Sequence, residues 1–304
     1  MIQRMLEIRD LVKSYDGVIA VNGLSFEVFQ GEVFGLLGPN GAGKTTTIRI
    51  IMDIFRPDSG YVRVLGEPAG LARNRVGYLP EERGLYRDLP VLETLVYLAQ
   101  LKGTPAPQAQ ERAMYWLQRV ELDDWAGRKV RDLSRGMQQK VQFVASLVHA
   151  PSLLILDEPF QGLDPLNVEL LKRLIRELQA EGTTIVLSAH EMRLVEALCD
   201  RIVLIHGGRA VLYGQLDEIK RRYASHTVRL RTPAPLEEWP GVIQVSRRDD
   251  VYTLTLGDLS PQQMLATLVE RGVPIDAFEV ATVPLDEIFI RVVSGAEAGA
   301  SVGE

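Results

Sequence analysis

Residues 38–45 read Gly38-Pro39-Asn40-Gly41-Ala42-Gly43-Lys44-Thr45, a glycine-rich run that ends in a lysine and a hydroxyl residue. Glycines let consecutive backbone N–H groups turn toward a polyphosphate, because side chains at those positions would block the approach. Lys44 supplies a positive charge, and Thr45 can ligate Mg²⁺. The run therefore predicts a phosphate-binding loop, with Thr46 as the next residue beside the phosphates.

The residues on either side of this loop support the prediction. Val33–Leu37 is an apolar run that indicates a buried strand, and residues 46–52 have the composition of a helix with an apolar face. Phosphate loops of this type lie between a strand and a helix. An ordinary glycine-rich turn is the alternative, and the two flanks together disfavour it.

A second informative stretch is the apolar run Leu153–Leu156, which ends in Asp157, Glu158 and Pro159. Burial of the strand explains the apolar residues but not the two acids at its tip. In a nucleotide site, Asp157 would contact the Mg²⁺ held at Thr45, and Glu158 would polarise the attacking water. The alternative is a solvated junction between a strand and a loop, but the phosphate loop favours the nucleotide site.

Further motifs follow in a consistent order along the chain. They are Leu133-Ser134-Arg135-Gly136-Met137-Gln138, then Gly162-Leu163-Asp164, then His190 after the apolar run 184–188, with Tyr15 earlier at the end of the first predicted strand. Together with the phosphate loop and the paired acids, they resemble the ATP-binding subunit of ABC transporters over roughly residues 5–222. The resemblance implies a P-loop NTPase fold, with ATP and Mg²⁺ as cofactors.

The resemblance also implies a role for each of these residues. Tyr15 would stack on adenine, and His190 would contact the γ-phosphate. Ser134 and Gly136 would face the phosphates held by a second subunit, and Asp164 would belong to the turn beside them. Plainer interpretations are open: Tyr15 can pack against a strand end, His190 can be a surface histidine, and Ser134 can cap a helix.

The chain departs from the commonest family pattern at a few positions. Glu81 stands where many members have glutamine, and it could ligate Mg²⁺ or be a solvated loop acid. Arg135 replaces a glycine and Met137 replaces a glutamine in the signature motif. These changes resemble the ABC-2 type exporter subgroup, whose ATPase subunits work with separate permeases and carry extra C-terminal sequence.

Composition limits the class of protein. With 304 residues, of which 46% are hydrophobic and 24% charged, the chain can form two domains. Its single cysteine, Cys199, excludes an intrachain disulfide and favours a reducing compartment. No apolar stretch approaches the ~18 to 20 residues of a membrane helix. The net charge of −6 argues against nucleic acid as a partner.

Patterning along the chain predicts an α/β domain at residues 1–222, with a helical subdomain at about 88–150, and the resemblance implies that this is the ATPase domain. Within it we expect strands at 61–65, 152–156, 184–188 and 201–205, and a helix at 167–180. Residues 223–294 predict a small α+β accessory domain, and residues 295–304 a disordered tail. In the accessory domain we expect strands at 227–231, 242–246, 251–256 and 277–283, a hairpin turn at 247–250, and helices after Ser260 and Pro284.

The functional expectation is an ATP-hydrolysing subunit that dimerises around ATP and drives transport, in the export direction, through a separate transmembrane permease. Lys44, Glu158 and His190 are the expected catalytic residues. The second ATPase subunit would be an identical chain or a sibling, and both would lie in the cytoplasm at the inner face of the cell membrane. The surface of residues 82–89 is expected to receive a short permease helix. The alternative is a soluble ABC-type ATPase that acts on nucleic acid, ribosomes or proteins, whereas a P-loop kinase or GTPase would leave the signature motif and His190 without a role.

Overall fold

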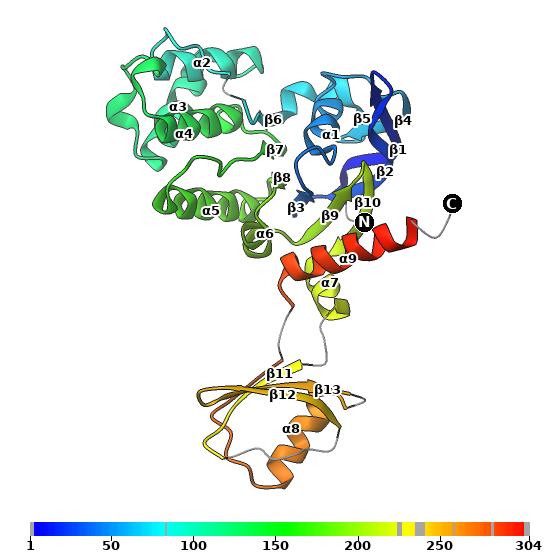
Figure 1. Cartoon of the computed structure of the whole chain (residues 1–304). Coiled ribbons are helices and arrows are strands. Elements are labelled where there is room, and N and C mark those ends of the chain that lie inside the picture. The colour runs from blue at the N-terminus through cyan, green and yellow to red at the C-terminus, as the bar shows by residue number, and fades with distance from the viewer. Residues whose placement is uncertain are drawn as a thin grey trace. The chain divides into compact units, whose positions relative to one another are not determined.

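A computed structural model describes residues 3–82, 84–223, 227–234, 241–257, 259–280 and 283–300 (Figure 1). The chain divides into two compact units, Met1–Leu216 and Asp217–Glu304. The boundary expected from the sequence, residue 222, falls inside helix α7 (Leu216–Tyr223), which starts at this division. No helix in the described ranges is long and apolar enough to cross a membrane.

A six-stranded sheet with the order β10-β9-β3-β8-β7-β6 forms the centre of the first unit. Its strands are β3 (Val33–Leu37), β6 (Val76–Leu79), β7 (Leu153–Asp157), β8 (Thr184–Ala189), β9 (Arg201–His206) and β10 (Arg209–Gln215). All pairs are parallel except β9 with β10. Every residue of β3, β7 and β8 is buried, which explains why these strands read as continuous apolar runs. The strands expected at 152–156, 184–188 and 201–205 are confirmed to within one residue at each end.

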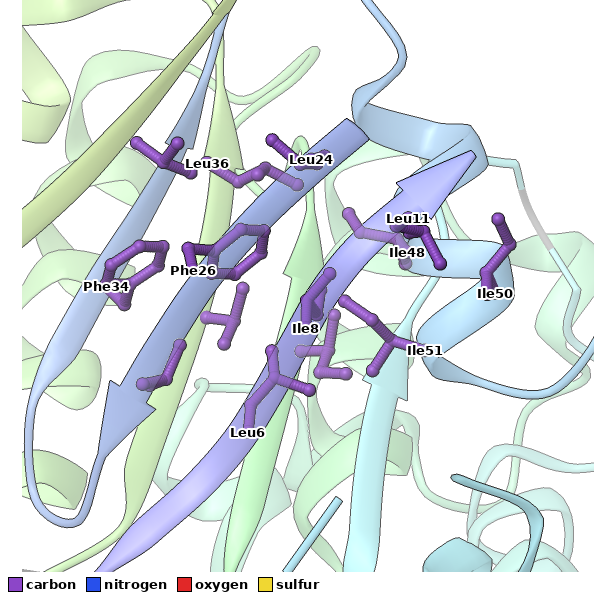
Figure 2. Close-up of a cluster of buried hydrophobic side chains, with 14 of the residues drawn as sticks. Leu6, Ile8, Leu11, Leu24, Phe26, Phe34, Leu36, Ile48, Ile50 and Ile51 are labelled. Atoms are coloured by element: carbon purple, nitrogen blue, oxygen red, sulfur yellow. The ribbon is translucent and has the colours of Figure 1, made fainter. Parts of the chain in front are cut away.

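A second sheet, antiparallel and with the order β2-β1-β4-β5, packs over helix α1 (Lys44–Ile51). Its strands are β1 (Arg4–Tyr15), β2 (Val18–Phe29), β4 (Ser59–Val64) and β5 (Glu67–Pro68). Figure 2 shows Leu6 and Ile8 of β1, Phe26 of β2, Phe34 of β3 and Ile48 of α1 in one buried cluster. The phenylalanine rings stack with their centroids 5.2 Å apart. This cluster holds α1, and with it the end of the phosphate loop, against the central sheet.

The helices expected at about 88–150 are present as α2 (Val91–Leu101), α3 (Ala106–Arg119) and α4 (Arg135–Leu147). Ser134 caps α4 by accepting a hydrogen bond from the N–H of Met137. After β7, Asp164 caps α5 (Pro165–Ala180) in the same way, accepting from the N–H of Asn167 at 3.0 Å. Helices α5 and α6 (Met192–Leu198) pack on β8.

The parallel strands determine where the functional segments meet. Leu37 pairs with Ala189, and Asp157 pairs with Ser188, so the carboxyl ends of β3, β8 and β7 lie at one edge of the sheet. The phosphate loop follows β3, Glu158 follows β7, and His190 follows β8. Ligands of open parallel sheets bind at this edge. The topology therefore brings three distant stretches of sequence together.

The second unit contains a four-stranded antiparallel sheet with the order β12-β13-β11-β14. Its elements are β11 (Thr227–Arg231), β12 (Val242–Arg248), β13 (Val251–Leu256), α8 (Pro261–Glu270), β14 (Ala277–Val280) and α9 (Leu285–Ala300). Val228, Leu230 and Leu254 from the sheet pack with Met264 and Leu268 of α8. The capping role expected for Ser260 is confirmed, because its side chain accepts from the N–H of Gln263.

Three boundaries in this unit differ from the prediction. Strand β12 continues to Arg248, so the hairpin turn is shorter than the expected 247–250 and contains Asp249 with a positive φ of 57°. Strand β14 ends at Val280, before the expected residue 283, and residues 281–282 lie outside the described ranges. We expected a disordered tail from Gly295, but helix α9 extends to Ala300. The alanines at 296, 298 and 300 have a high helix propensity, which favours this extension. The last predicted tail residues, 301–304, lie outside the described ranges.

His149, just after α4, is a partly buried titratable group within the first unit. Its Nε2 lies 3.2 Å from the carbonyl oxygen of Val76, while its buried Nδ1 has no hydrogen-bond partner among the described residues. Burial lowers the pKa of His149 to about 4, and the nearby Lys102 lowers it further. The folded protein therefore keeps this imidazole neutral at pH values where the unfolded chain would protonate it.

We expect His149→Gln to reduce the loss of stability in acid. Between the ordinary histidine pKa of about 6.5 and the folded value of about 4, the unfolded state binds the extra proton, so stability falls as pH falls through this window. Glutamine can donate to Val76 without titrating. The free energy of unfolding, measured in urea at pH 7 and pH 5, should fall by about 1–2 kcal/mol less in the variant. His206→Gln serves as the control, and equal acid losses in the wild type and His149→Gln would contradict the prediction.

Candidate nucleotide-binding site

The phosphate loop has a backbone that only glycine tolerates at two positions. Gly38 has a φ of +149°, and a Cβ there would lie 2.3 Å from the carbonyl oxygen of Ile205. Gly43 has a φ of +107°, and a Cβ there would lie 2.4 Å from the carbonyl oxygen of Ala20. Helix α1 starts directly after Gly43, with no side-chain cap on its first N–H groups. The free N–H groups at the start of α1 therefore lie at the phosphate loop, which is a favourable position for an anion.

Lys44 lies within this loop rather than extending into solvent. Its side chain is buried, and its Nζ donates to the carbonyl oxygens of Gly38 at 2.7 Å and Pro39 at 3.3 Å. The same Nζ lies 3.9 Å from Oε1 of Glu158. The ammonium group is thus held between the loop and the catalytic carboxylate predicted from the sequence, where a polyphosphate would meet its charge.

Asp157 is fully buried at the end of β7. Its Oδ1 accepts a short hydrogen bond from Oγ of Ser188, which also accepts from the N–H of Glu158 at 3.1 Å. The other carboxylate oxygen, Oδ2, has no hydrogen-bond partner within the described residues. Burial raises the pKa of Asp157, and the charge of Glu81 raises it further, whereas Ser188, Lys44 and Thr45 act in the opposite direction.

These groups fit a divalent cation. A buried carboxylate oxygen without a partner is costly unless a proton or a cation compensates for it. Thr45 and Glu81, the other two predicted metal ligands, both line the cavity beside the phosphate loop. Carboxylate and hydroxyl oxygens are the ligands that Mg²⁺ prefers.

Glu158 and His190 form a pair at the carboxyl ends of β7 and β8. Nδ1 of His190 lies 2.8 Å from Oε2 of Glu158, and the histidine side chain is half exposed. Glu158 has a positive φ of 50°, which is unusual outside glycine and turns the backbone sharply at the strand end. Burial raises the pKa of Glu158, and His190 and Lys44 oppose that increase. A carboxylate with a raised pKa, hydrogen-bonded to an imidazole, is suited to accept a proton from water.

A cavity of about 570 Å³ joins these groups. It contains most of the predicted nucleotide-binding residues together with two that the sequence analysis did not identify, Ala20 and Gln161. The lining residues are Tyr15, Ala20, Pro39, Asn40, Gly41, Ala42, Gly43, Lys44, Thr45, Thr46, Glu81, Glu158, Gln161 and His190. Gly38 and Asp157 are not in this lining: the carbonyl oxygen of Gly38 accepts from Lys44, which lines the cavity, and Asp157 accepts from Ser188.

Tyr15 lies in the cavity wall with 39% of its surface exposed, and its ring packs edge-on against Phe55 with the centroids 5.9 Å apart. The backbone before it is anchored, because the N–H and Oγ of Ser14 both donate to Asp58. Lys13 also donates to Asp58, and these bonds lower the pKa of that carboxyl to about 2. Nζ of Lys13 lies 5.5 Å from the centroid of the tyrosine ring. The tyrosine therefore lies at an anchored strand end, with part of its ring exposed in the cavity wall.

Besides Gly38 and Asp157, the predicted residues Ser134, Gly136 and Asp164 are not among those that line this cavity. Ser134 and Asp164 instead cap α4 and α5, as described above. A Cβ at Gly136 would lie 3.7 Å from Leu163, so the signature motif and the turn before α5 are neighbours within one chain.

The sequence analysis also missed Ser188, which connects Asp157 to the backbone of Glu158. A hydroxyl residue inside an otherwise apolar strand, two positions before His190, was the available signal. Ala20 carried no such signal, because its contribution depends on how β2 passes the loop.

We expect Gly38→Ala to abolish detectable ATP binding and to lower the free energy of unfolding by about 2–4 kcal/mol, because the new Cβ would overlap the backbone of Ile205. Gly127→Ala is the matched control, since no atom lies within 4 Å of the Cβ position there. It should change stability by less than about 0.5 kcal/mol. Equilibrium ATP binding and urea unfolding measure both effects, and wild-type ATP affinity in Gly38→Ala would disprove the loop geometry.

Comparison with known proteins identifies the family of this chain. A family model described as ABC transporter matches residues 21–161, and one described as ATP-binding protein DrrA1-3-like, C-terminal domain, matches residues 214–293. The uncharacterised ABC transporter ATP-binding protein YhaQ of Bacillus subtilis (strain 168) is 40% identical over 295 residues, covering 95% of this chain and 98% of that protein.

Two further matches cover about 70% of the chain. The Nod factor export ATP-binding protein I of Burkholderia orbicola (strain AU 1054) is 40% identical over 213 residues, covering 69% of this chain and 70% of that protein. A solved structure of an ATP binding subunit of an ABC transporter superposes with a TM-score of 0.68 at 34% identity, over 72% of this chain and 93% of that one. The fold is thus that of the P-loop ABC ATPases, and the chain belongs to the family of ABC transporter ATP-binding proteins.

Proposed function

We propose that this chain binds ATP together with Mg²⁺, hydrolyses it, and thereby drives export through a separate membrane permease. The observation that carries the proposal is the position of Glu158, which contacts His190 at 2.8 Å and lies 3.9 Å from Lys44 at one cavity. A base, its histidine partner and a phosphate-binding lysine are the groups that phosphoryl transfer to water needs.

In this proposal the loop from Gly38 to Thr46 and the N-terminus of α1 hold the phosphates, and Lys44 exchanges its carbonyl contacts for phosphate oxygens. Tyr15 stacks on the adenine at the other side of the cavity. Oδ2 of Asp157, the hydroxyl of Thr45 and the carboxylate of Glu81 would hold Mg²⁺. Bound Mg²⁺ would neutralise charge on the terminal phosphates.

Glu158 orients the attacking water and accepts its proton as the water oxygen bonds to the γ-phosphorus and the bond to the ADP oxygen breaks. Its burial raises its pKa and so makes it a better proton acceptor than an exposed glutamate. Nδ1 of His190 contacts Glu158, and its Nε2, which has no partner among the described residues, is available to the γ-phosphate.

The site is completed by a second ATPase subunit. Ser134 and Gly136 lie outside the cavity of their own chain, at the N-terminus of α4, where the helix dipole and the N–H groups that Ser134 does not cap favour an anion. In the proposed dimer they contact the γ-phosphate bound to the other subunit, and Asp164 lies in the turn beside them. Bound γ-phosphate then favours the closed dimer, and release of the phosphate after hydrolysis favours the open dimer. The partner is an identical chain or a sibling subunit.

The export direction is supported by the relative named for Nod factor export, and the permease by the relatives named as transporter ATP-binding proteins. Within residues 82–89, of which Arg83 lies outside the described ranges, Tyr86 packs against Tyr97 of α2 with the ring centroids 5.5 Å apart. We expect this surface to receive the short permease helix. Such contacts would place the chain in the cytoplasm, peripheral at the inner face of the cell membrane.

We expect Glu158→Gln to bind ATP with an affinity within about threefold of wild type, while turnover falls by at least about 100-fold, because the amide cannot accept the proton. ATP binding at equilibrium and phosphate release at saturating ATP measure the two effects. Glu181→Gln, an exposed change of the same type, is the control. Near-normal hydrolysis in Glu158→Gln would sink the assignment.

Transport is tested by affinity capture of the chain from mildly solubilised native membranes, followed by mass spectrometry. We expect a multi-span permease in stoichiometric amount, with Glu158→Gln capturing it equally well because the permease surface is separate from the catalytic carboxylate. Recovery of ribosomes or nucleic acid with a chain found wholly in the soluble fraction would support the alternative, an ABC-type ATPase without a permease.

A further inference from the structure

Gln142, in the middle of α4, contacts the loop that carries Glu81. The side chain is 4% exposed, and its Nε2 donates to the carbonyl oxygens of Pro80 at 3.2 Å and Glu82 at 3.0 Å. These carbonyls belong to the residues immediately before and after Glu81. A single amide therefore holds the backbone on both sides of the carboxylate.

Such a restraint matters because Glu81 is an exposed residue at a cavity that also holds another carboxylate. Glu81 shares the cavity with Glu158, and its charge contributes to the raised pKa of Asp157. Because Glu81 is exposed, water competes for its carboxylate, and the position of its backbone limits how far the side chain can move away from the cavity. A hydrogen bond to the Glu81 carboxylate itself could hold it, but the contacts described here hold its backbone instead.

The chemistry at position 142 is specific. Two carbonyl oxygens require two N–H donors from one atom, and a primary amide supplies both. Oε1 of Gln142 is buried and has no partner among the described residues, so the two donated bonds alone determine how the amide is turned. The reversed amide would place this oxygen against two carbonyl oxygens, which is unfavourable.

A neighbour on the same helix makes a parallel contact. Gln139 is also buried, and its Nε2 donates to the carbonyl oxygen of Pro159 at 3.1 Å, in the turn directly after Glu158. Residues three apart on a helix share a face. One face of α4 is therefore hydrogen-bonded to the loops that carry both Glu81 and Glu158.

We propose that Gln142 is a positioning residue that keeps Glu81 at the metal end of the nucleotide cavity and so connects that end to the helix capped by Ser134. The proposal rests on the binding of ATP and Mg²⁺ proposed above. Gln142 contacts no reacting atom, and its effect passes through the Pro80–Glu82 backbone.

The test is the increase in ATP affinity that Mg²⁺ provides, measured at equilibrium as the Kd in EDTA divided by the Kd with Mg²⁺, in a Glu158→Gln background that prevents turnover. Gln142→Met keeps the length of the side chain and removes both donors. We expect it to lower this ratio about three- to tenfold while leaving the Kd in EDTA within twofold. Glu81→Ala should lower the ratio at least as much, and the double variant should resemble Glu81→Ala alone, because both changes affect one contact.

Ser146→Ala is the control, since it removes a buried hydrogen bond of α4 to the carbonyl of Phe143 without touching the Glu81 loop. It should leave the ratio unchanged. If Gln142→Met does not fold, Gln142→Leu is measured in the same way. The proposal for Gln142 would be overturned by a folded Gln142→Met variant with the wild-type ratio. It would also be overturned if the reductions of the ratio by Gln142→Met and Glu81→Ala multiplied in the double variant. Absence of any ATP binding by the parent protein would instead overturn the proposed function.

Discussion

The parallel pairing of β3, β8 and β7 is the constraint on which the site depends. Because the carboxyl ends of adjacent parallel strands meet at one edge, the phosphate loop, the Asp157–Glu158 pair and His190 become neighbours although they are far apart in sequence. The strands can pair this way because both faces of the sheet are covered, which their continuous apolar sequences permit. The core shown in Figure 2 holds α1 against this sheet and so keeps the phosphate loop in place.

The charged side chains at this edge of the sheet lack some of the opposite charges and hydrogen-bond partners that would stabilise them. Lys44 is occupied by carbonyls of its own loop, and Asp157 keeps one buried oxygen without a partner in the described structure. Burial raises the pKa values of both Asp157 and Glu158. A polyphosphate with a divalent cation would supply the missing negative charge to Lys44 and the missing positive charge to the carboxylates. This complementarity supports the proposed binding of a nucleotide together with its cation.

Helix α4 connects this edge of the sheet to the helical subdomain. At its N-terminus lies the Ser134 cap, and along its buried face Gln139 and Gln142 donate to the loops after β7 and β6. A shift of this helix would therefore move the backbone beside both carboxylate-bearing loops. In the proposed transporter, these contacts are a physical route from a permease on the helical subdomain to the catalytic carboxylate.

The sequence by itself determined the parts of the site that are local. The phosphate loop could be predicted because its backbone requirement appears in the sequence as glycines at fixed positions. In the structure, positive φ values and close backbone approaches restrict positions 38 and 43 to glycine. Asp157 and Glu158 could be predicted as well, because two acids at the tip of a buried apolar strand are costly unless they bind a cation or a proton. The capping residues Ser134 and Ser260 were also readable, because a cap bonds to its own helix within three residues.

Only the tertiary structure decided which groups from separate segments touch. Ser188 supports Asp157 through strand register, Gln142 reaches the Glu81 loop across the subdomain, and Ala20 meets Gly43 because of the path of β2. The predicted ends of β12, β14 and α9 were wrong. Strand and helix propensities are marginal at these positions, so packing determines where each element ends. Local backbone conformation and helix capping depend on residues adjacent in sequence. Contacts between distant segments depend on sheet topology, which no short motif specifies.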